Sequence, residues 1–392
     1  MSLDQTPNAN RFHIGIFGKR NTGKSSLINA ITNQNVSVVS DIAGTTTDPV
    51  KKAMEIHGIG PCLFIDTAGF DDKGELGKLR NEKTLLAAKN IDCAIVLIND
   101  ENFDAEIKFI NSLQNTPVII VINKCDANKN ADALSNKIFD KTKILPLMVS
   151  AKTHKNIDAI IDALKKIKPF SQDSIVNSLV QKNDLVLLVM PQDIQAPQGR
   201  LILPQVQTIR DLLDNKCITV CTTTDNFLNA LDLLTKPPKL IITDSQEFKF
   251  VYENKPEKSL LSSFSVLFAK YKGDINEFIK GAQKIDSLTE NSCVLIAEAC
   301  THVPLDEDIG RVKIPRLLRK KIGPGLKIDI VNGNNFPDDL SKYDLVVHCG
   351  SCMFNRKFLL SRIEKAKQNN VPITNYGVLI AKLNGILDKV CF

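Results

Sequence analysis

Short apolar runs alternate with amphipathic stretches along the first part of this chain. Apolar runs at 12–17, 62–65, 116–122 and 144–149 predict buried strands, and helical spacing at 27–31 predicts a helix. Buried strands that alternate with helices are typical of a mostly parallel sheet covered by helices. We therefore predict that the chain begins with an α/β domain.

The same alternation restarts at residue 184, after a predicted helix and linker at 164–178. The middle runs predict strands at 185–190, 218–222 and 240–243 and helices at 205–213 and 225–234. The last runs predict helices at 263–271 and 275–285 and strands at 293–297 and 344–347. The whole is thus predicted to be an α/β protein of three domains, 1–170, 171–262 and 263–392. The middle domain has no phosphate-binding motif, so we interpret it as a dimerisation domain.

A glycine-rich segment, GKRNTGKS at 18–25, joins the first predicted strand to the first predicted helix. It fits the pattern of glycine, four residues and Gly-Lys-Ser that binds nucleotide phosphates. Lys24 would contact the β- and γ-phosphates, and the Ser25 hydroxyl would ligate Mg²⁺. The residues predicted to surround the phosphates are Gly18, Asn21, Thr22, Gly23, Lys24 and Ser25.

Two further motifs match the switch segments of GTPases. In the segment at 43–49, Thr46, or alternatively Thr45, would complete the magnesium shell and sense the γ-phosphate. A predicted strand then ends in Asp-Thr-Ala-Gly, in which Asp66 would hold the metal through water and the Gly69 N–H would contact the γ-phosphate. We predict that Lys24, Thr46, Asp66 and Gly69 carry the catalysis.

The base of the nucleotide is predicted from two later motifs. Asn-Lys-Cys-Asp follows the strand at 116–122, and the Asp126 carboxylate can accept hydrogen bonds from N1–H and the 2-amino group of guanine. Adenine offers neither donor, so GTP is selected. The predicted base-binding residues are Asn123, Lys124, Asp126, Ser150, Ala151 and Lys152. Four motifs at strand ends, in this order, predict a GTP-hydrolysing domain.

Two residues refine the predicted hydrolysis. Phe70 follows the Asp-x-x-Gly motif where Ras-type enzymes carry a water-orienting glutamine, so hydrolysis would use another group or be slow without help. With Gly44-Thr45-Thr46, the loop around Asn21 resembles the TrmE/Era class of GTPases. In potassium-activated members, an asparagine at this position holds a K⁺ ion that supplies positive charge. The alternative for Asn21 is a turn residue.

Cysteine and histidine residues follow two predicted strands in the last domain. Glu-Ala-Cys-Thr-His at 298–302 follows the strand at 293–297, and His-Cys-Gly-Ser-Cys at 348–352 follows the strand at 344–347. Parallel strands would bring both motifs to one sheet edge. Thiolates suit an iron–sulfur cluster, and Cys/His mixtures also suit zinc. The spacing leaves these two metals open.

With these motifs, three more stretches make the chain similar to the HydF family. They are DTAGFDDKGELG at 66–77, DIGRVKIP at 308–315 and PITNYGV at 372–378. The resemblance implies a GTPase scaffold that carries a di-iron precursor of the FeFe-hydrogenase active site. Radical-SAM maturases, HydE and HydG, would supply the precursor, and apo FeFe-hydrogenase would receive it. It also implies a homodimer, in some members a tetramer, formed through the middle domain.

The resemblance further implies a 4Fe–4S cluster on Cys300, Cys349 and Cys352. Three cysteines leave one iron open to another ligand, and the candidates are Glu298, His302 and His348. Glu298 lies two residues before Cys300, on the same face of an extended strand. As a hard ligand among soft thiolates it would be exchangeable, which suits a scaffold. The alternative is that Glu298 pairs with a basic residue and the histidines support the ligands.

Composition limits the remaining possibilities. The net charge of +6 without a dense basic block does not indicate nucleic-acid binding. Residues 1–10 lack the apolar core of a signal peptide, and the apolar runs are too short to span a membrane, so we expect a cytoplasmic protein. Cys217 and Cys221 are predicted to be buried thiols. Two other functions stay open, a TrmE-like tRNA-modification GTPase with a structural zinc and a regulatory GTPase.

Overall fold

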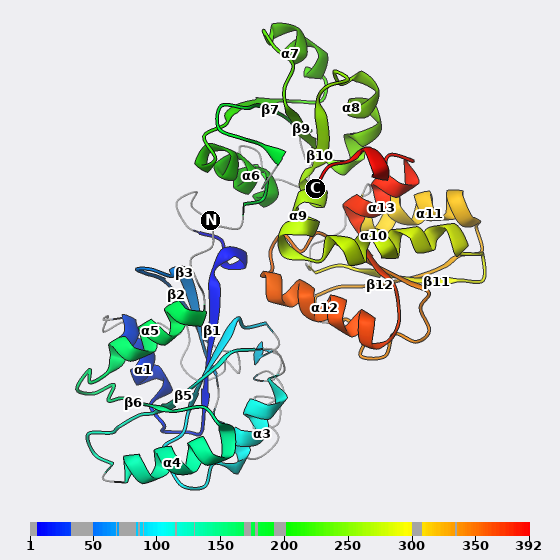
Figure 1. The fold of residues 1–392 in the computed structure, drawn as a ribbon. Coiled ribbons are helices and arrows are strands. Elements are labelled where there is room, and N and C mark those ends of the chain that lie inside the picture. Colours follow the sequence, from blue (N-terminus) through cyan, green and yellow to red (C-terminus); the bar gives the residue numbers. More distant parts are fainter. Residues whose placement is uncertain are drawn as a thin grey trace, which may run out of the picture. The chain divides into compact units, whose positions relative to one another are not determined.

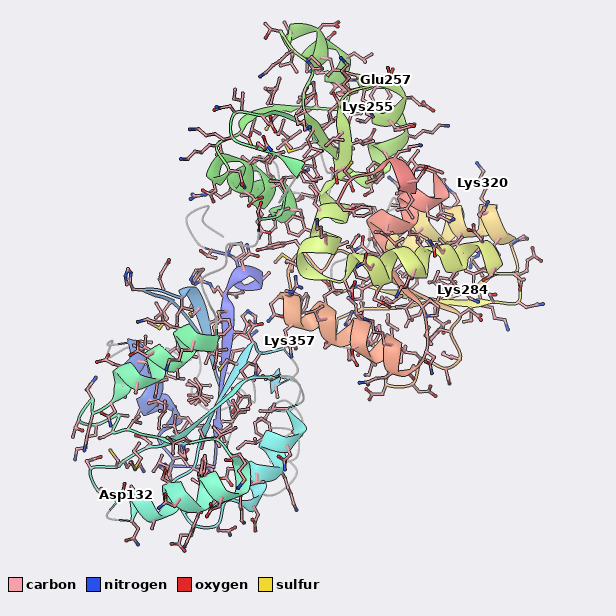
Figure 2. All side chains as sticks on the ribbon, viewed as in Figure 1. Asp132, Lys255, Glu257, Lys284, Lys320 and Lys357 are labelled. Atoms are coloured by element: carbon pink, nitrogen blue, oxygen red, sulfur yellow. The ribbon has the colours of Figure 1, made fainter. Side chains whose placement is uncertain are left out.

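The computed structural model describes residues 6–32, 50–67, 69, 84, 87–88, 90–113, 116–128, 130–167, 174–176, 179–191, 201–299, 308–333 and 335–392. The chain divides into two compact units, Met1–Ser171 and Gln172–Phe392, whose elements are labelled in Figure 1. Exposed charged side chains such as Asp132, Glu257 and Lys320 point away from the ribbon of their own unit (Figure 2). None of the helices described is long and apolar enough to cross a membrane.

The first unit is built on a six-stranded sheet with the order β2-β3-β1-β4-β5-β6. Its strands are β1 (Phe12–Gly18), β2 (Val50–Ile56), β3 (Gly60–Asp66), β4 (Cys93–Leu97), β5 (Val118–Ile122) and β6 (Leu147–Met148). All pairings are parallel except that of β2 with β3. The predicted mostly parallel sheet is therefore confirmed. The apolar run at 144–149 forms a strand of only two residues.

Helices cover both faces of this sheet, as Figure 1 shows. They are α1 (Lys24–Thr32), α3 (Asp104–Ser112), α4 (Ala131–Thr142) and α5 (Ile157–Ile167). The apolar side chains of α1 and α5 pack into one core, and those of α3 and α4 pack into another on the opposite face. Because apolar helices enclose the central strands on both sides, β1 and β4 are buried almost throughout.

The second unit contains two parallel four-stranded sheets. The sheet with the order β10-β9-β7-β8 is formed by β7 (Leu185–Val189), β8 (Ile218–Thr222), β9 (Leu240–Thr243) and β10 (Leu260–Ser263). Its helices are α6 (Leu203–Asp214), α7 (Phe227–Leu233), α8 (Phe248–Asn254) and α9 (Phe264–Lys272). Helices α6 and α9 pack with β7 in one core, and α7 and α8 pack on the other face.

One sequence-based prediction about this sheet is wrong. Cys217 is buried as predicted, but Cys221 is exposed. Cys221 lies on β8, which is an edge strand of the sheet, and Ile218 on the same strand is also exposed. The five-residue pattern ITVCT at 218–222 does not distinguish an edge strand from a central one. The Cys221 thiol is exposed because β8 lies at the edge of the sheet.

The other sheet of this unit has the order β12-β11-β13-β14. Its strands are β11 (Cys293–Ala297), β12 (Lys327–Val331), β13 (Leu345–His348) and β14 (Ile373–Asn375). Its helices are α10 (Ile275–Gln283), α11 (Ile314–Ile322), α12 (Arg356–Gln368) and α13 (Tyr376–Leu383). One hydrophobic core contains side chains from both sheets of the unit. The predicted division of this unit into two domains at 262 and 263 stays a prediction.

Helices α9 and α10 follow one another in the sequence between β10 and β11, and a capping side chain fixes the start of each. The Ser263 side chain accepts a hydrogen bond from the Val266 N–H at the start of α9. The Asp274 side chain accepts from the Asn276 and Glu277 N–H groups at the start of α10. Each cap satisfies backbone donors that have no partner within the helix. The change of chain direction after α9 is therefore encoded locally.

Gly281 allows α10 to approach β14. A Cβ atom at this position would overlap the backbone of Ile373 and lie 3.0 Å from Thr374 N. Substitution by alanine should therefore destabilise the second unit by about 1–3 kcal/mol through overpacking. In an unobstructed helix the same change would stabilise by up to about 1 kcal/mol.

The measurement is thermal unfolding combined with hydrogen exchange of the α10 and β14 amides. Gly281→Ala should lower both the melting temperature and the protection. Lys280→Ala, on the exposed side of α10, is the control and should change little. A Gly281→Ala protein that is as stable as the wild type would show that the close approach does not exist.

Candidate nucleotide and metal sites

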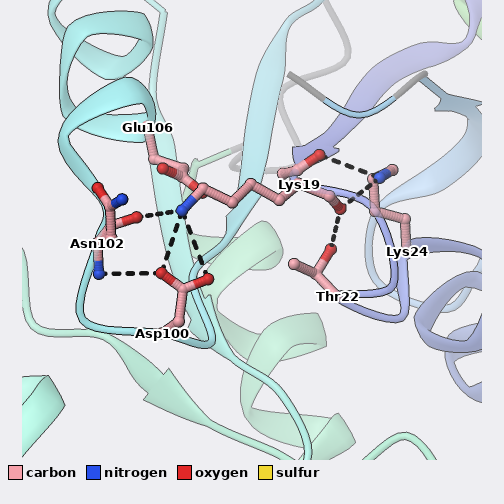
Figure 3. A network of polar contacts seen from close by, with 7 residues as sticks. Lys19, Thr22, Lys24, Asp100, Asn102 and Glu106 are labelled. Atoms are coloured by element: carbon pink, nitrogen blue, oxygen red, sulfur yellow. Dashed lines mark hydrogen bonds and ion pairs between the residues drawn. The ribbon is translucent and has the colours of Figure 1, made fainter. Parts of the chain in front are cut away.

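The segment between β1 and α1 forms a compact loop. Gly18 and Gly23 adopt positive φ angles of 145° and 90°, which glycine tolerates best. Lys24 Nζ donates hydrogen bonds to the carbonyls of Gly18 (3.0 Å) and Lys19 (2.9 Å). The Thr22 hydroxyl donates to the same Lys19 carbonyl at 2.9 Å, as Figure 3 shows. The Lys24 ammonium group thus lies over the loop in which nucleotide phosphates are predicted to bind.

Lys19 connects this loop to the segment after β4 (Figure 3). Its Nζ atom lies 3.1 Å from the Asp100 carboxylate and 3.9 Å from the carboxylate of Glu106, which is buried at the start of α3. It also donates to the Asn102 carbonyl. No sequence pattern predicts this role of Lys19, because its partners lie about 80 residues away and have no motif of their own.

The two residues predicted to hold magnesium lie in direct contact. Ser25 Oγ donates a hydrogen bond of 2.6 Å to Asp66 Oδ2. Burial raises the pKa of Asp66, and the Ser25 hydroxyl and the Lys24 charge oppose that rise. In P-loop NTPases, a hydroxyl and a carboxylate of this kind hold Mg²⁺.

Asn123 connects the phosphate loop to both base-binding motifs. Its Nδ2 atom donates to the Thr22 carbonyl at 3.1 Å. Its Oδ1 atom accepts from the N–H groups of Lys124 (2.8 Å) and Ala151 (3.0 Å). Lys124 Nζ donates to the Asn21 carbonyl at 2.7 Å. The structure therefore brings together three motifs, of which the phosphate loop lies 101 residues from Asn123 and Ala151 lies 28 residues from it.

Asp126 and Ser150 are also neighbours. A hydrogen bond from the Ser150 side chain is the main reason that the pKa of Asp126 lies below its ordinary value, and Lys152 contributes to the same shift. Asp126 is exposed, whereas Ser150 is fully buried. The carboxylate is therefore ionised at neutral pH and accessible as an acceptor for guanine N–H groups.

Only some of the other residues predicted to bind or hydrolyse the nucleotide lie within the described part of the chain. Asn21 is exposed and adopts a left-handed conformation with φ 58°, which asparagine tolerates better than most residues. That conformation fits a turn residue, and the role of its side chain toward K⁺ stays a prediction. Gly69 is buried after β3. Thr45, Thr46 and Phe70 lie outside the described residues.

The cysteine motif that follows β13 lies beside the end of β11. The two strands are parallel neighbours with Ala297 opposite His348, and the Cys349 N–H continues the pairing by donating to the Ala297 carbonyl at 3.0 Å. Cys349 Sγ accepts a hydrogen bond of 3.0 Å from the Ala299 N–H. Burial raises the pKa of the Cys349 thiol, and the N–H groups of Ala299 and Ser351 oppose that rise.

Cys352 is half-buried three residues further along the same loop. A buried lysine at the end of α9 supports this loop. Lys272 Nζ donates to the carbonyls of Ser351 (3.3 Å), Cys352 (3.1 Å) and Phe354 (2.9 Å). Cys300 and His302 lie outside the described residues. The structure thus brings Cys349 and Cys352 to the end of β11 from which Cys300 follows.

Arginines engage both described candidates for the fourth iron ligand. Glu298 is 3% exposed, and its Oε2 atom accepts from Arg311 Nε at 3.1 Å and Nη2 at 3.0 Å. His348 is fully buried, its Nδ1 lies 2.7 Å from the Cys349 carbonyl, and its Nε2 lies 2.8 Å from Arg362 Nη1. Since arginine only donates, His348 carries its proton on Nδ1.

Burial, followed by the Arg362 charge, lowers the pKa of His348 to about 3. The ring is therefore neutral, and both of its nitrogens are already engaged. These contacts fit the alternative prediction, in which Glu298 pairs with a basic residue and the histidine supports the ligands. Which residue would ligate the fourth iron stays a prediction. Arg311 lies within the segment at 308–315 that the sequence singled out, whereas Lys272 and Arg362 had no sequence signal.

Comparisons with known proteins agree with this architecture. A family model described as a 50S ribosome-binding GTPase matches residues 13–124. Two further models, the dimerization and tetramerization domains of hydrogen maturase F, match residues 175–273 and 276–391.

Individual relatives match mainly the first unit. GTPase Der of Mycoplasmopsis agalactiae is 36% identical over 195 residues, which is 45% of this chain and 44% of that protein. The tRNA modification GTPase MnmE of Endomicrobium trichonymphae is 34% identical over 181 residues, 44% of this chain and 39% of that protein. The chain therefore spans less than half the length of these relatives. A crystal structure of Era from Aquifex aeolicus bound to GDP and AlF₄⁻ gives a TM-score of 0.35 at 22% identity and covers 54% of this chain and 92% of that one.

The first unit is a P-loop GTPase domain of the TrmE/Era type, followed by α/β domains with parallel sheets. The two hydrogen maturase F models together match more than half of the chain. The chain belongs to the hydrogen maturase F (HydF) family.

Asp126 gives a direct test of base recognition. In Asp126→Asn, one acceptor is replaced by a donor, so GTP affinity should fall by about a hundredfold, the scale of a lost hydrogen bond to a charged group. Affinity for xanthosine triphosphate, which presents a carbonyl in place of the 2-amino group, should rise. Competition binding with fluorescent nucleotides measures both. Asp140→Asn, on the exposed face of α4, is the control, and an unchanged preference for guanine in Asp126→Asn would refute the assignment.

Proposed function

We propose that this protein is a GTP-hydrolysing scaffold that binds a 4Fe–4S cluster and carries a di-iron precursor to apo FeFe-hydrogenase. The observation that supports this most strongly is the pairing of β11 with β13, with Ala297 opposite His348. With that register, the segment beginning at Glu298 and the loop from Cys349 to Cys352 leave the same edge of one sheet. Membership of the hydrogen maturase F family supports the same function.

For hydrolysis, we assign the predicted roles to the chain as follows. Lys24 neutralises charge on the β- and γ-phosphates, and Ser25 with Asp66 holds Mg²⁺, with Thr46 completing the shell. The Gly69 N–H contacts the γ-phosphate, and Asp126 selects guanine. The contact between Ser25 and Asp66 supports this assignment. Phe70 supplies no water-orienting group, so hydrolysis is slow unless another charge assists.

K⁺ is the charge that we propose for this purpose, held by the Asn21 side chain beside the phosphates. The exposed side chain of Asn21 lies in the loop that Lys24 and Lys124 hold together. A monovalent cation there would stabilise the charge that develops in the transition state, as an arginine finger does.

Replacement of Na⁺ by K⁺ at constant ionic strength should therefore raise the GTPase rate about tenfold or more. Asn21→Gly should abolish the response, because glycine accepts the backbone conformation of φ 58° but lacks the amide. Asn183→Gly, at a position with φ 70° in the second unit, should keep it. Phosphate release assays in Na⁺ and in K⁺ measure the GTPase rate of each variant. Equal rates for the wild type in the two salts would leave Asn21 as a turn residue.

The residues present fit an iron–sulfur cluster. Cys300, Cys349 and Cys352 supply three soft thiolates, and the N–H group of Ala299 already donates to Cys349 Sγ. A cluster held by three cysteines keeps one iron available to a further ligand. Glu298, His302 or His348 would occupy that position, and the di-iron precursor delivered by HydE and HydG would displace it.

The oligomer that we propose forms through the segment of the second unit that contains β8. This edge strand exposes Ile218, and Leu213 and Leu233 on α6 and α7 are also exposed. An unpaired strand edge with apolar neighbours is suited to pairing with a second copy. The two family models support a homodimer through the middle segment, as expected, and a tetramer through the last segment, which differs from the expectation that the middle domain forms both. We place the protein in the cytoplasm, where its partners would act.

The cluster assignment is tested by iron content. Cys349→Ala and Cys352→Ala should lose most of the iron and sulfide taken up on anaerobic reconstitution, because two thiolates hold a cluster poorly. Cys391→Ala, a half-buried cysteine in the same unit, should keep them. GTP hydrolysis should change less than about twofold in all three variants. Activation of apo FeFe-hydrogenase in the presence of HydE and HydG should follow iron content.

Lys24→Ala provides the reciprocal test, because it should abolish hydrolysis while the cluster still assembles. Normal iron uptake by Cys349→Ala and Cys352→Ala would contradict the assigned ligands. Zinc in place of iron would favour a TrmE-like or regulatory GTPase.

A further inference from the structure

The end of β14 lies at the same sheet edge as the cysteine motifs. β14 pairs in parallel with β13, and Asn375 is opposite His348, the residue before Cys349. Asn375 and Tyr376 belong to the segment at 372–378, which the sequence singled out without giving it a role. Because the strands are parallel and in register, these two residues leave the sheet beside Cys349.

Both residues carry a buried donor. Asn375 is fully buried, and its Oδ1 atom accepts from the Gly377 N–H at 2.8 Å, which caps α13. Its Nδ2 atom and the Tyr376 hydroxyl are buried and have no hydrogen-bond partner within the described part of the chain. Buried polar groups are nearly always paired in proteins, and each exception calls for an explanation.

The surroundings of the Tyr376 hydroxyl show where it is directed. A Cβ atom on Gly310 would overlap that hydroxyl and would lie 2.7 Å from Glu298 Oε1. The hydroxyl and the carboxylate of Glu298 therefore share the space beside Gly310, while the other carboxylate oxygen accepts from Arg311. Glycine at 310 leaves this space open. Gly310 of the segment at 308–315 and Tyr376 of the segment at 372–378 thus both lie beside Glu298, the first residue of the Glu-Ala-Cys motif.

The chemistry around Tyr376 keeps it a donor. Its phenol group carries one O–H that can be donated in a hydrogen bond. The nearby charges are Glu298, Asp308 and the thiol on the acidic side and Arg311 on the basic side. A neutral phenol beside anionic groups offers a proton to an acceptor and does not compete with the thiolates for a cation.

We propose that the Tyr376 hydroxyl and the Asn375 amide donate hydrogen bonds to the sulfur atoms of the iron–sulfur cluster held beside them. The inference rests on the proposed function, because it takes a cluster at Cys349 as given. These residues are positioning residues and not ligands. Sulfide and thiolate sulfurs become more negative when a cluster is reduced, so donors stabilise the reduced form. The pair would therefore raise the reduction potential of the cluster.

The experiment is a redox titration of the reconstituted full-length protein, followed by the EPR signal of the reduced cluster. Tyr376→Phe removes one donor and keeps the ring. Asn375→Asp removes the other donor and keeps the oxygen that caps α13. Tyr252→Phe, on α8 in the other sheet of the unit, is the matched control for loss of a hydroxyl.

Tyr376→Phe and Asn375→Asp should keep wild-type iron content and GTPase activity. Poised at the wild-type midpoint, each should show a ratio of reduced to oxidised cluster lower by about tenfold, the scale of one hydrogen bond to a charged acceptor. Tyr252→Phe should match the wild type. A wild-type midpoint in both variants overturns the inference, and loss of iron in Tyr376→Phe overturns it in favour of a ligand or structural role. A wild-type protein that takes up no iron overturns the proposed function, and with it this inference.

Discussion

The parallel register of neighbouring strands is the constraint on which both sites depend. In the second unit, Ala297 pairs with His348 and His348 with Asn375, so three chain segments leave one edge of the sheet together. In the first unit, Ile16 pairs with Asp66, so the phosphate loop after β1 begins beside the carboxylate that ends β3. The hydrogen bond between Ser25 and Asp66 is a consequence of that register. A slip of one residue would turn these side chains to the opposite face.

Buried cations give the cysteine edge its electrostatic character. Lys272 is 2% exposed and Arg362 is 5% exposed, and a buried charge is tolerated only where polar groups compensate it. Three carbonyls of the cysteine loop accept from Lys272, and His348 Nε2 and the Gly333 carbonyl lie against Arg362. Arg362 also lies against the rings of Phe336 and Phe358, at 4.8 and 4.2 Å from their centroids. This concentration of positive charge favours an anionic group at the edge.

Lys272 also connects the two parts of the second unit. It is the last residue of α9, which lies in the segment that the dimerization model matches, whereas its carbonyl partners lie in the segment that the tetramerization model matches. The shared hydrophobic core joins the same two parts. The cysteine loop is thus supported by a helix of the neighbouring sheet.

The sequence predicted the elements whose signal is local. Continuous apolar runs located β1, β5, β7, β9 and β11, and the phosphate loop and the base motif at Asn123 were found because each depends on residues close in sequence. Strands β12 and β14 were missed. β12 is an edge strand in which Lys327 and Asp329 interrupt the apolar residues, and β14 has only three residues. The exposure of Cys221 was missed because edge position is a property of the whole sheet.

The identity of the partners of the candidate site residues could not be predicted for a related reason. Arg311 reaches Glu298 across 13 residues, and Arg362 reaches His348 across 14 residues and a loop, with no periodic pattern between them. Sequence reasoning raised both residues as iron ligands because it recognised their chemical type. A basic partner for Glu298 was the alternative interpretation, but neither Arg311 nor the Arg362 partner of His348 could be identified from the sequence.

The central claim, that one chain joins a GTP site to an iron–sulfur site, is tested most directly by the metal content of the wild-type protein. The protein would be reconstituted anaerobically, and iron, sulfide, zinc and bound guanine nucleotide would be quantified in the same sample. The account predicts about four iron atoms and four sulfides per chain together with one guanine nucleotide. Stoichiometric zinc without iron, in a protein that still binds GTP, would contradict it.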